Sequence, residues 1–251
     1  MLSIVIPQFN KAKMTENCID SIMDNTNSEY EIVLVDNGSS DIISDEYKKK
    51  VKYIRSDSNL NFAGGCNLGA RNVKYDNICF LNNDTLPFKN WENAQSLLGE
   101  KVGIVGSKLL YPDGTIQHAG VEYIPLRNGE PISTEHRFRN APDMTPGSDV
   151  DRECPIVTGA CLFISKQDFD KVNGFDENYQ NWFEDTDICY KVRFDLKKSV
   201  LYNHGSRLIH LESATGRDMN MTPMHVHSRA YFYKKWSSVF KREIDFWNNN
   251  N

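Results

Sequence analysis

The chain has 251 residues, of which 39% are hydrophobic and 25% are charged, and its formal net charge is −5. That length allows one large or two small domains with a buried core, and the mildly acidic balance excludes a broad surface for nucleic acids or anionic membranes. The chain opens on an apolar run without the features of a secretory signal, and no apolar run is long enough to span a membrane. We therefore expect a soluble, cytoplasmic protein.

Within the first half, short apolar runs alternate with helix-like segments, which is typical of a parallel sheet covered by helices. Strands are expected at 2–7, 31–36, 51–55, 77–82 and 102–109. Apolar residues at helical spacing predict a helix over 11–25, and a short helix is expected within 61–73. This order predicts an α/β fold with a Rossmann-like, mostly parallel sheet, which binds ligands at the carboxyl ends of its strands.

The second half begins with a turn signal and an alternating run, which predict a small hairpin arm over 111–124. Residues 125–153 hold four prolines and lack periodicity, so we expect a long loop that serves as a lid or an acceptor surface. The other expected elements are strands at 155–165, 199–203 and 206–211, and helices at 166–174, 184–194 and 222–247, the last one capped by Thr222 with Pro223 at its first position.

Six cysteines are spread along the chain without the paired spacing of a metal site or the density of a disulfide scaffold. Several of them, including Cys79 and Cys161, lie inside apolar runs. We expect reduced thiols that pack in the core.

The expected strand that ends on Asp36 is followed by Asn-Gly in the stretch "VDNGSSD". Such a turn leaves the acid exposed at the edge of the sheet, where it could accept hydrogen bonds from a base or a ribose. Asp-Asn-Gly is also an ordinary turn. The stretch alone leaves both interpretations open.

Two adjacent glycines, Gly64 and Gly65, precede a helix in "NLNFAGGCNLGARN". Glycines there let the backbone approach a phosphate or a sugar without interference from Cβ. The pattern is neither G-x-G-x-x-G nor a P-loop, which disfavours a dinucleotide-binding dehydrogenase. The alternative is that the helix needs glycine for packing.

The apolar run "ICFLNNDT" stops on Asn82, Asn83 and Asp84, whose side chains cost free energy when they are buried without partners. One explanation is a turn, which Asn and Asp favour. The other is that their oxygens hold Mg²⁺ or Mn²⁺, which neutralises a diphosphate. One carboxylate alone is too few ligands for such a cation, and His210 is a further candidate ligand because imidazole suits Mn²⁺ better than Mg²⁺. A lone histidine at a strand end is otherwise structural.

Three carboxylates, those of Glu184, Asp185 and Asp187, fall in the first turn of an expected helix. Acids favour helix amino termini through the helix dipole, and Asp187 also suits an ordinary i,i+4 ion pair. The functional alternative is that one acid is a general base aimed into a cleft. The adjacent Trp182 and Phe183 would then exclude water or stack on a sugar.

Taken together, these stretches resemble the inverting family 2 glycosyltransferases with the GT-A fold, and within them the rhamnosyltransferase-like enzymes of O-antigen or capsule assembly. The likeness spans roughly residues 2 to 216. It rests on the joint order of "SIVIPQFNK", "IVLVDNGSSD", "NFAGGCNLGAR", "FLNNDT", "LLYPDGTIQHAG", "VTGACLFISKQDFDKVNGFDENYQNWFEDTDICYKV" and "IHLESATG". The resemblance implies a GT-A domain over 1–216, with a nucleotide-binding half at 1–110 and an acceptor and catalytic half at 111–216, and a helical extension at 217–251.

The resemblance also implies roles for single residues. Asp185 matches the general base, with Glu184 beside it, and Asp84 and His210 match metal-contacting positions. Donor nucleotide-sugar binding is implied for eight residues: Pro7, Asn10, Asp36, Asn61, Gly65, Asn67, Asn82 and Asn83. Trp182 and Phe183 fall on the acceptor side.

The implied activity is the inverting, metal-dependent transfer of a sugar from a UDP- or dTDP-sugar to a hydroxyl of a glycan or a lipid-linked saccharide, with Mn²⁺ or Mg²⁺ as cofactor and no nucleic-acid partner. One departure is Asn82, which stands where the common DxD motif has its first acid and contributes no charge. Two other classes stay open: a non-catalytic glycan- or nucleotide-binding relative, which Asn82 favours, and a sugar nucleotidyltransferase, which the missing Gly-rich phosphate cradle disfavours.

The carboxyl-terminal helix expected over 222–247 mixes basic and aromatic residues. Such a surface suggests peripheral contact with the inner face of a membrane that carries a lipid-linked acceptor, or contact with another chain. The alternative is an amphipathic helix packed on the core. His225 and His227 are two residues apart, which separates them on a helix and argues against a zinc pair.

Overall fold

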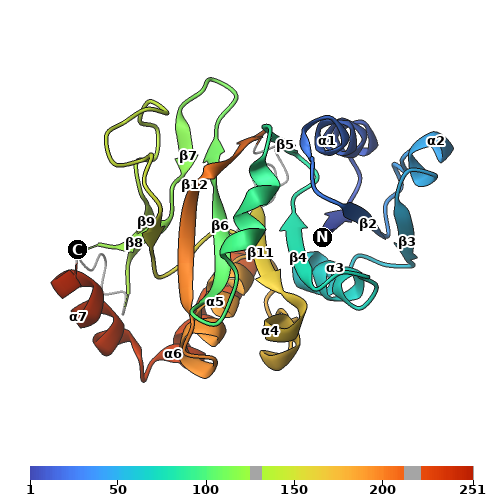
Figure 1. Ribbon diagram of the computed structural model, residues 1–251. Helices are drawn as coiled ribbons and strands as arrows, with labels where there is room; N and C mark the ends of the chain where they lie inside the picture. The colour runs from blue at the N-terminus through green and yellow to red at the C-terminus, as the bar shows by residue number, and fades with distance from the viewer. Residues whose placement is uncertain (125–131, 212–221, 251) are drawn as a thin grey trace.

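The computed structural model describes residues 1–124, 132–211 and 222–250 (Figure 1). The elements of the first half are β1 (Leu2–Gln8), α1 (Ala12–Asn25), β2 (Tyr30–Asn37), α2 (Asp45–Lys48), β3 (Lys52–Ser56), α3 (Asn61–Ala70), β4 (Asn77–Leu81), β5 (Thr85–Pro87), the 3₁₀ helix η1 (Trp91–Leu97) and β6 (Val102–Leu110). Those of the second half are β7 (Ile116–His118), β8 (Val121–Tyr123), β9 (Thr134–His136), β10 (Arg152–Glu153), β11 (Cys161–Ser165), α4 (Lys166–Lys171), α5 (Glu184–Asp195), β12 (Ser199–His210), α6 (Thr222–Trp236) and α7 (Phe240–Asn250).

Ten of the described strands form one sheet, with β10-β12-β6-β11-β4-β1-β2-β3 in order, β5 beside β12 and β7 beside β6. Strands β3, β2, β1 and β4 run parallel to one another, and β6 runs parallel to β12. Strand β11 is inserted between β4 and β6 and is antiparallel to both. The predicted α/β fold is confirmed, and its sheet is mixed because β5, β7, β10 and β11 pair antiparallel with their neighbours.

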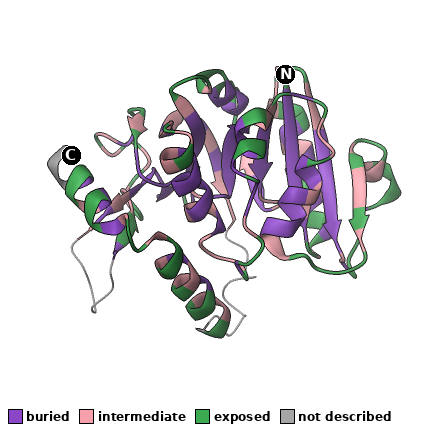
Figure 2. Ribbon diagram, turned by 90° about the horizontal axis from the view of Figure 1, so that it is seen from below, coloured by how far each residue is buried: buried purple, intermediate pink, exposed green. Residues whose placement is uncertain are grey.

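The sheet separates two hydrophobic clusters because alternate residues of its strands face opposite sides. In β1, Val5 belongs to the cluster on the side of α3, α4 and α5, whereas Ile4 and Ile6 belong to the cluster on the side of α1 and η1. Buried residues accordingly concentrate in the strands and on the inner helix faces (Figure 2). The polar carboxyl ends of β1, β2 and β4 therefore meet at one edge of a rigid layer.

One predicted pair of strands is a single strand. We expected separate strands at 199–203 and 206–211, but β12 runs without interruption from Ser199 to His210 with a register shift between Asn203 and Arg207. Gly205 lies in this irregular stretch, and the Oδ1 atom of Asn203 accepts the amide of Ser206 at 2.9 Å. A glycine inside a strand often marks such a bulge.

Other predicted bounds also change. The strand expected over 155–165 begins only at Cys161, because the backbone before it bonds to other elements. Strands β9 and β10 lie within the predicted 125–153 loop, of which residues 125–131 lie outside the described part. The hairpin arm forms by antiparallel pairing of β7 with β6.

The helix predicted over 222–247 is two helices, α6 and α7, separated by a turn in which the Val239 amide bonds to the Trp236 carbonyl at 3.0 Å. The break lets Phe232 and Phe240 both enter the core cluster, with their rings 5.9 Å apart. Helix α6 begins at Thr222, but the predicted cap by the Thr222 side chain lies outside what the structure describes. The two helices pack on the core, which agrees with the second of the two interpretations of this segment, an amphipathic helix against the core.

All six cysteines are unpaired and buried, as the sequence predicted. Cys79 and Cys161 face each other across β4 and β11 with their sulfurs 3.9 Å apart. Burial raises the pKa of the Cys18 thiol to about 12, so this group is inert as a nucleophile at neutral pH.

Candidate active site

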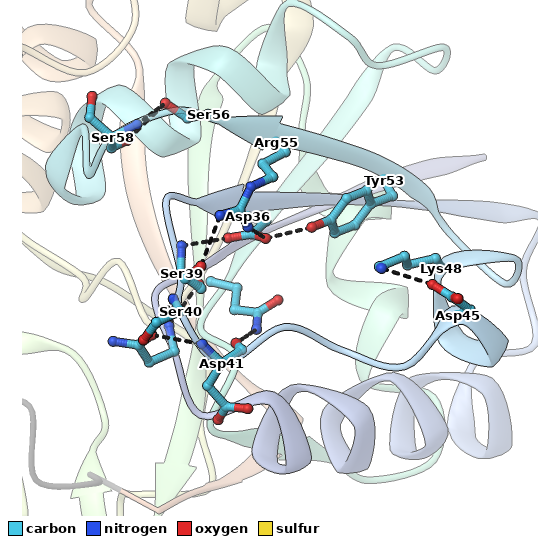
Figure 3. Close-up of polar contacts among 12 residues, drawn as sticks. Asp36, Ser39, Ser40, Asp41, Asp45, Lys48, Tyr53, Arg55, Ser56 and Ser58 are labelled. Atoms are coloured by element: carbon cyan, nitrogen blue, oxygen red, sulfur yellow. Dashed lines mark hydrogen bonds and ion pairs between the residues drawn. The ribbon is translucent and has the colours of Figure 1, made fainter.

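Asp36 is the residue before the last of β2, and it is fully buried, which corrects the expectation of an exposed acid. Figure 3 shows its polar contacts. One of its oxygens accepts the backbone amide of Ser39 at 2.8 Å, and the other accepts the hydroxyl of Tyr53 and the guanidinium of Arg55. Burial alone would raise the pKa of this carboxyl, but the hydrogen bonds and the guanidinium hold it below its ordinary value. Asp36 therefore acts by fixing Arg55, whose half-exposed side chain presents a charge at the sheet edge.

Asn10 follows β1 in a left-handed conformation, with φ of 58°. Its Oδ1 atom accepts the backbone amides of Ser40 and Asp41 at 2.9 and 3.2 Å, and its own amide donates to the hydroxyl of Ser39 at 2.8 Å. These contacts fasten the loop after β1 to the loop after β2. Asn10 thus shapes the edge where the first two strands end.

The glycines of α3 serve close packing. A Cβ atom on Gly65 would lie 3.2 Å from the Nδ2 atom of Asn37 and 3.3 Å from the Cβ atom of Pro7, and one on Gly69 would lie 2.3 Å from a methyl of Val5. Glycine at position 69 therefore lets α3 lie directly on β1, and glycine at position 65 makes its approach to Asn37 and Pro7 close. Close packing, which the sequence left open, is an observed role of Gly65.

Asn67 is also occupied by the protein. Its Oδ1 atom accepts the amide of Phe175 at 3.0 Å, and its Nδ2 atom donates to the Phe175 carbonyl at 2.9 Å and to Glu177 at 2.8 Å. These bonds join α3 to the segment between α4 and α5, and they use every hydrogen-bonding group of the side chain except one lone pair. Asn67 therefore has a structural role, and its contact with a donor stays a prediction.

Asn61 starts α3 at φ of 58°, and its carbonyl accepts the Nδ2 atom of Asn37 at 2.9 Å. The next residue, Phe62, donates its backbone amide to the Oδ1 atom of Asn181 at 3.3 Å. The start of α3 therefore lies against the residues that lead into α5. Asn61 keeps a partly exposed side chain at this junction.

Asp84 and His210 meet, as the metal prediction required. The Oδ1 atom of Asp84 lies 3.1 Å from the Nε2 atom of His210, and both side chains are largely buried. The Nδ1 atom of His210 lies 2.6 Å from the Oε1 atom of Gln117 on β7. Donation from Nδ1 to that carbonyl leaves the lone pair of the neutral ring on Nε2, facing the carboxylate.

This pair fits a divalent cation. A lone pair and a carboxylate oxygen at that distance repel each other unless a proton or a cation lies between them, and a metal-bound histidine usually donates its other ring N–H to a carbonyl, as His210 does to Gln117. Within residues 1–124, 132–211 and 222–250 no cluster of three or more His, Cys, Asp or Glu side chains could hold a metal. Protein ligands are therefore few, and a cation here needs oxygens from a diphosphate or water.

The side chains of Asn82 and Asn83, which precede Asp84, have different partners. The Nδ2 atom of Asn82 lies 3.4 Å from the Nε2 atom of His210, which places it beside the pair. Asn83 instead donates to the hydroxyl of Thr15 on α1 at 2.9 Å. Asn82 therefore stays with the candidate metal site, and Asn83 fixes the turn.

Asp185 lies in the first turn of α5, half-buried, and both of its oxygens accept backbone amides. Its Oδ2 atom accepts that of Gly159 at 3.0 Å, and its Oδ1 atom accepts that of Thr186 at 2.7 Å. A Cβ atom on Gly159 would lie 3.2 Å from the Cβ atom of Asp185. The carboxylate is thus held in one orientation by two backbone N–H donors.

Glu184 is separated from Asp185 by burial. Its side chain is packed inside, its Oε2 atom has no hydrogen-bond partner in the described structure, and burial and the neighbouring charge of Asp185 raise its pKa to about 8. At neutral pH Glu184 is therefore mostly protonated, and a protonated carboxyl cannot serve as a base. The structure favours Asp185 alone as a base.

The Glu184→Gln variant tests this difference. The unfolded chain ionises this carboxyl above about pH 4.5, whereas the folded protein keeps it protonated up to about pH 8, so the wild type loses stability as the pH rises through this window and loses no more above it. The neutral amide removes that loss. We expect the variant to gain on the order of 3 kcal/mol relative to the wild type at pH 7 and little at pH 4, measured by urea unfolding. Parallel stability profiles would contradict the assignment.

Trp182 and Phe183 lie in a strained segment. Asn181, Trp182 and Phe183 all have positive φ, of 63°, 59° and 70°, which costs about 1 kcal/mol or more for each such residue. The carbonyl of Asn181 accepts the hydroxyl of Ser228 on α6 at 2.8 Å, and the rings of Trp182 and Phe183 lie 5.9 and 5.6 Å from that of His225. Helix α6 thus holds the segment that presents Asp185.

Adjacent residues connect the two parts of the site. Gly159 donates its amide to Asp185, and Ala160 accepts the amide of Asn82 through its carbonyl at 3.0 Å. The base candidate on α5 and the polar turn after β4 are therefore held by consecutive residues. The sequence analysis did not identify Gln117 or Arg55. Gln117 and His118 are polar residues within the alternating run of the hairpin arm, and such residues, which are buried here, can indicate a site.

Comparisons with known proteins identify the family and the fold. The family model of glycosyl transferase family 2 matches residues 3–171. A second model, described as the N-terminal domain of galactosyltransferase, matches residues 146–211. The crystal structure of GalNAc-T7 with UDP, GalNAc and Mn²⁺ superposes with a TM-score of 0.74 at 18% identity, over 97% of this chain and 50% of that one. The GT-A fold is thereby confirmed.

Three curated relatives extend the comparison. The uncharacterized protein y4gI of Sinorhizobium fredii is 29% identical over 98% of the chain, the O-antigen biosynthesis protein RfbC of Myxococcus xanthus is 28% identical over 86%, and the chondroitin synthase of Pasteurella multocida is 26% identical over 76%. The chain spans 27%, 18% and 23% of the lengths of these proteins.

Proposed function

The chain belongs to glycosyl transferase family 2, and from that premise we propose that it transfers a sugar from a UDP- or dTDP-sugar to a saccharide hydroxyl, with inversion at the anomeric carbon. One observation carries the proposal: Gly159 and Ala160 hold Asp185 and the polar turn at Asn82 side by side. A base and a site for the leaving diphosphate are the two parts that such a transfer needs.

Asp185 takes the proton in the proposed reaction. The acceptor oxygen forms a bond to the anomeric carbon while the bond from that carbon to the diphosphate breaks, and the hydroxyl proton passes to the carboxylate of Asp185. A neutral alcohol is a poor nucleophile, so a positioned base contributes about 10² to 10⁴ in rate. The amides of Gly159 and Thr186 keep the carboxylate aimed as its charge changes.

Asp84 and His210 are the residues that would hold Mn²⁺ or Mg²⁺. When bound, such a cation neutralises the charge that develops on the departing diphosphate. The chain supplies the carboxylate of Asp84, the Nε2 atom of His210 and the orientation of that ring by Gln117. Asn82 adds an amide without charge, so the donor itself must complete the ligand set.

The Asp84→Asn variant tests the metal site. The amide keeps the shape of the side chain but removes its charge, so we expect the strengthening of donor binding by Mn²⁺ to fall about 10- to 100-fold. Gln117→Leu should reduce the strengthening of donor binding by Mn²⁺ by a smaller factor, because His210 loses the partner that sets its orientation. Asp113→Asn, which removes a carboxylate from an exposed turn of the hairpin arm, is the matched control. Unchanged Mn²⁺ dependence in Asp84→Asn would count against the site.

Product analysis tests the reaction class directly. The wild type is incubated with a panel of UDP- and dTDP-sugars, with and without Mn²⁺ and with saccharide acceptors. Release of free nucleoside diphosphate supports sugar transfer, release of pyrophosphate indicates a nucleotidyltransferase, and binding without any product indicates a non-catalytic relative.

Polysaccharide assembly is the setting we propose, since relatives of the chain include an O-antigen biosynthesis protein and a chondroitin synthase. The acceptor is then a glycan or a lipid-linked saccharide, presented at the cytoplasmic side of a membrane. Across the described residues, no helix is both long and apolar enough to cross a bilayer. Phe246 and Val226, which are exposed on α7 and α6, are where peripheral membrane contact could be tested.

A further inference from the structure

Three consecutive residues before the proposed base have a left-handed backbone conformation. Asn181, Trp182 and Phe183 have φ of 63°, 59° and 70°. Asparagine tolerates this conformation, but it is an outlier for bulky side chains such as those of tryptophan and phenylalanine. The segment 181–183 therefore keeps its shape only where neighbouring groups hold it. A change in that shape would move the first turn of α5, which begins at Glu184.

Ser228 on α6 holds this segment. Its hydroxyl accepts the backbone amide of Gln180 at 3.1 Å and donates to the carbonyl of Asn181 at 2.8 Å, and the residue is fully buried. A serine in a helix interior commonly points to solvent or bonds to the carbonyl of the preceding turn. The hydroxyl of Ser228 instead binds two backbone groups of another segment, at the point where the left-handed residues begin.

The segment has further contacts with α6 and with α3. The ring centroid of Phe183 lies 5.3 Å from that of Phe232 on α6. The Oδ1 atom of Asn181 accepts the backbone amide of Phe62, near the start of α3, at 3.3 Å. Neither contact acts on the two backbone groups that Ser228 binds. Its hydroxyl therefore supplies a restraint that these contacts do not replace.

The position of Asp185 is sensitive to small displacements of this turn. Its Oδ2 atom accepts the amide of Gly159 at 3.0 Å, and a Cβ atom on Gly159 would lie 3.2 Å from the Cβ atom of Asp185. The two residues are thus in close contact, and a shift of the turn would lengthen their hydrogen bond or force them into each other. Misplacing a reacting group by about 1 Å can cost about 10²-fold in rate.

We propose that Ser228 is a positioning residue for the transfer reaction: it holds the backbone at residues 180 and 181, which keeps the left-handed segment in shape and the carboxylate of Asp185 against Gly159. The inference rests on the proposed transfer with Asp185 as base. Helix α6 begins beyond the matched residues 3–171 and 146–211. The catalytic unit of this chain then includes α6 as well.

The Ser228→Ala variant tests the proposal by its kinetics. We expect the rate of sugar transfer to fall about 10- to 100-fold, because the base loses its aim. The donor dissociation constant should stay within about twofold, because the carboxyl ends of β1, β2 and β4 are untouched. Ser237→Ala removes a hydroxyl from an exposed position just after the same helix and should keep the wild-type rate. A wild-type rate in Ser228→Ala overturns the proposal.

A double-mutant cycle distinguishes positioning from general destabilisation. In the Asp185→Asn background, Ser228→Ala should lower the residual rate by less than about twofold, because no base is left to aim. Single-turnover measurements with excess enzyme give both residual rates. A loss by the same factor in both backgrounds shows that the hydroxyl supports the fold alone, and it overturns the proposal.

Amide hydrogen exchange, followed by NMR, separates this inference from the proposed function. The Gly159 amide reports its contact with Asp185 without any substrate. In Ser228→Ala we expect this amide to exchange about tenfold or more faster, while the amides that pair β1 with β2 keep the wild-type rate. Unchanged exchange at Gly159 overturns the proposal even where transfer is observed. Faster exchange there, in a protein that turns over no donor, upholds the positioning of Asp185 and overturns the transfer.

Discussion

Asp185→Asn should lower the rate of sugar transfer by about 10² to 10⁴ while donor binding stays within about twofold of the wild type. The amide has the size of the carboxylate and can still accept one of the two backbone amides, so the fold of the first turn of α5 is kept. It cannot take the proton of the acceptor hydroxyl. The measurements are the steady-state rate of nucleoside diphosphate release with acceptor, and the donor dissociation constant by calorimetry.

Glu184→Gln is the matched control for this variant. It makes the same chemical change one residue earlier on the same helix, at a carboxyl whose raised pKa already keeps it mostly neutral at pH 7. We therefore expect nearly full transfer activity. Equal activity of Asp185→Asn and the wild type would remove Asp185 from the mechanism, and equal losses in both variants would show that the turn, not one acid, is required.

Local patterns predicted the sheet because its strands are apolar runs that stop at polar residues. β1, β2 and β4 are bounded in this way, and the structure places their carboxyl ends at one edge. The meeting of Asp84 with His210 was also anticipated, since one carboxylate alone is a small ligand set and His210 at a strand end was the further candidate ligand. Regular elements and strand-end residues follow from short-range sequence.

Roles that depend on distant partners were not predictable. Asn67 bonds to Phe175 and Glu177, which lie more than a hundred residues away in the sequence. Its neighbouring glycines suggested a bound ligand, but in the structure the protein itself provides the hydrogen-bond partners of this side chain. The same holds for Asp36, because its carboxylate accepts hydrogen bonds from Tyr53 and Arg55 on the neighbouring strand. An acid or an amide at a strand end marks a polar requirement, and only the tertiary structure shows whether a ligand or the chain meets it.

Asp187→Ala should lower the free energy of unfolding by about 3–5 kcal/mol, a large part of the stability of a typical domain. The buried carboxylate of Asp187 accepts Tyr179 at 3.0 Å and the indole of Trp236 at 2.8 Å, and it pairs with Lys235 at 2.9 Å. Truncation leaves these groups without this acceptor, and Lys235 keeps Asp176 as a counter-charge. Urea unfolding followed by circular dichroism measures the loss.

Asp170→Ala is the control for that loss. Asp170 is an exposed acid whose i,i+4 pair with Lys166 lies on the surface of α4, so its removal should cost less than about 1 kcal/mol. A loss below that limit in Asp187→Ala as well would show that α6 is not held through this carboxylate.

Asp185→Asn and Asp187→Ala together assign different tasks to neighbouring acids of one helical turn. Asp187 fastens α6 to α5, and α6 in turn holds the strained residues 181–183 that lead into the turn. We therefore expect Asp187→Ala to lower stability strongly and Asp185→Asn to leave it nearly unchanged. Catalysis and the anchoring of α6 would then depend on the same turn through separate side chains, which is why its three carboxylates cannot be interpreted as one acidic motif.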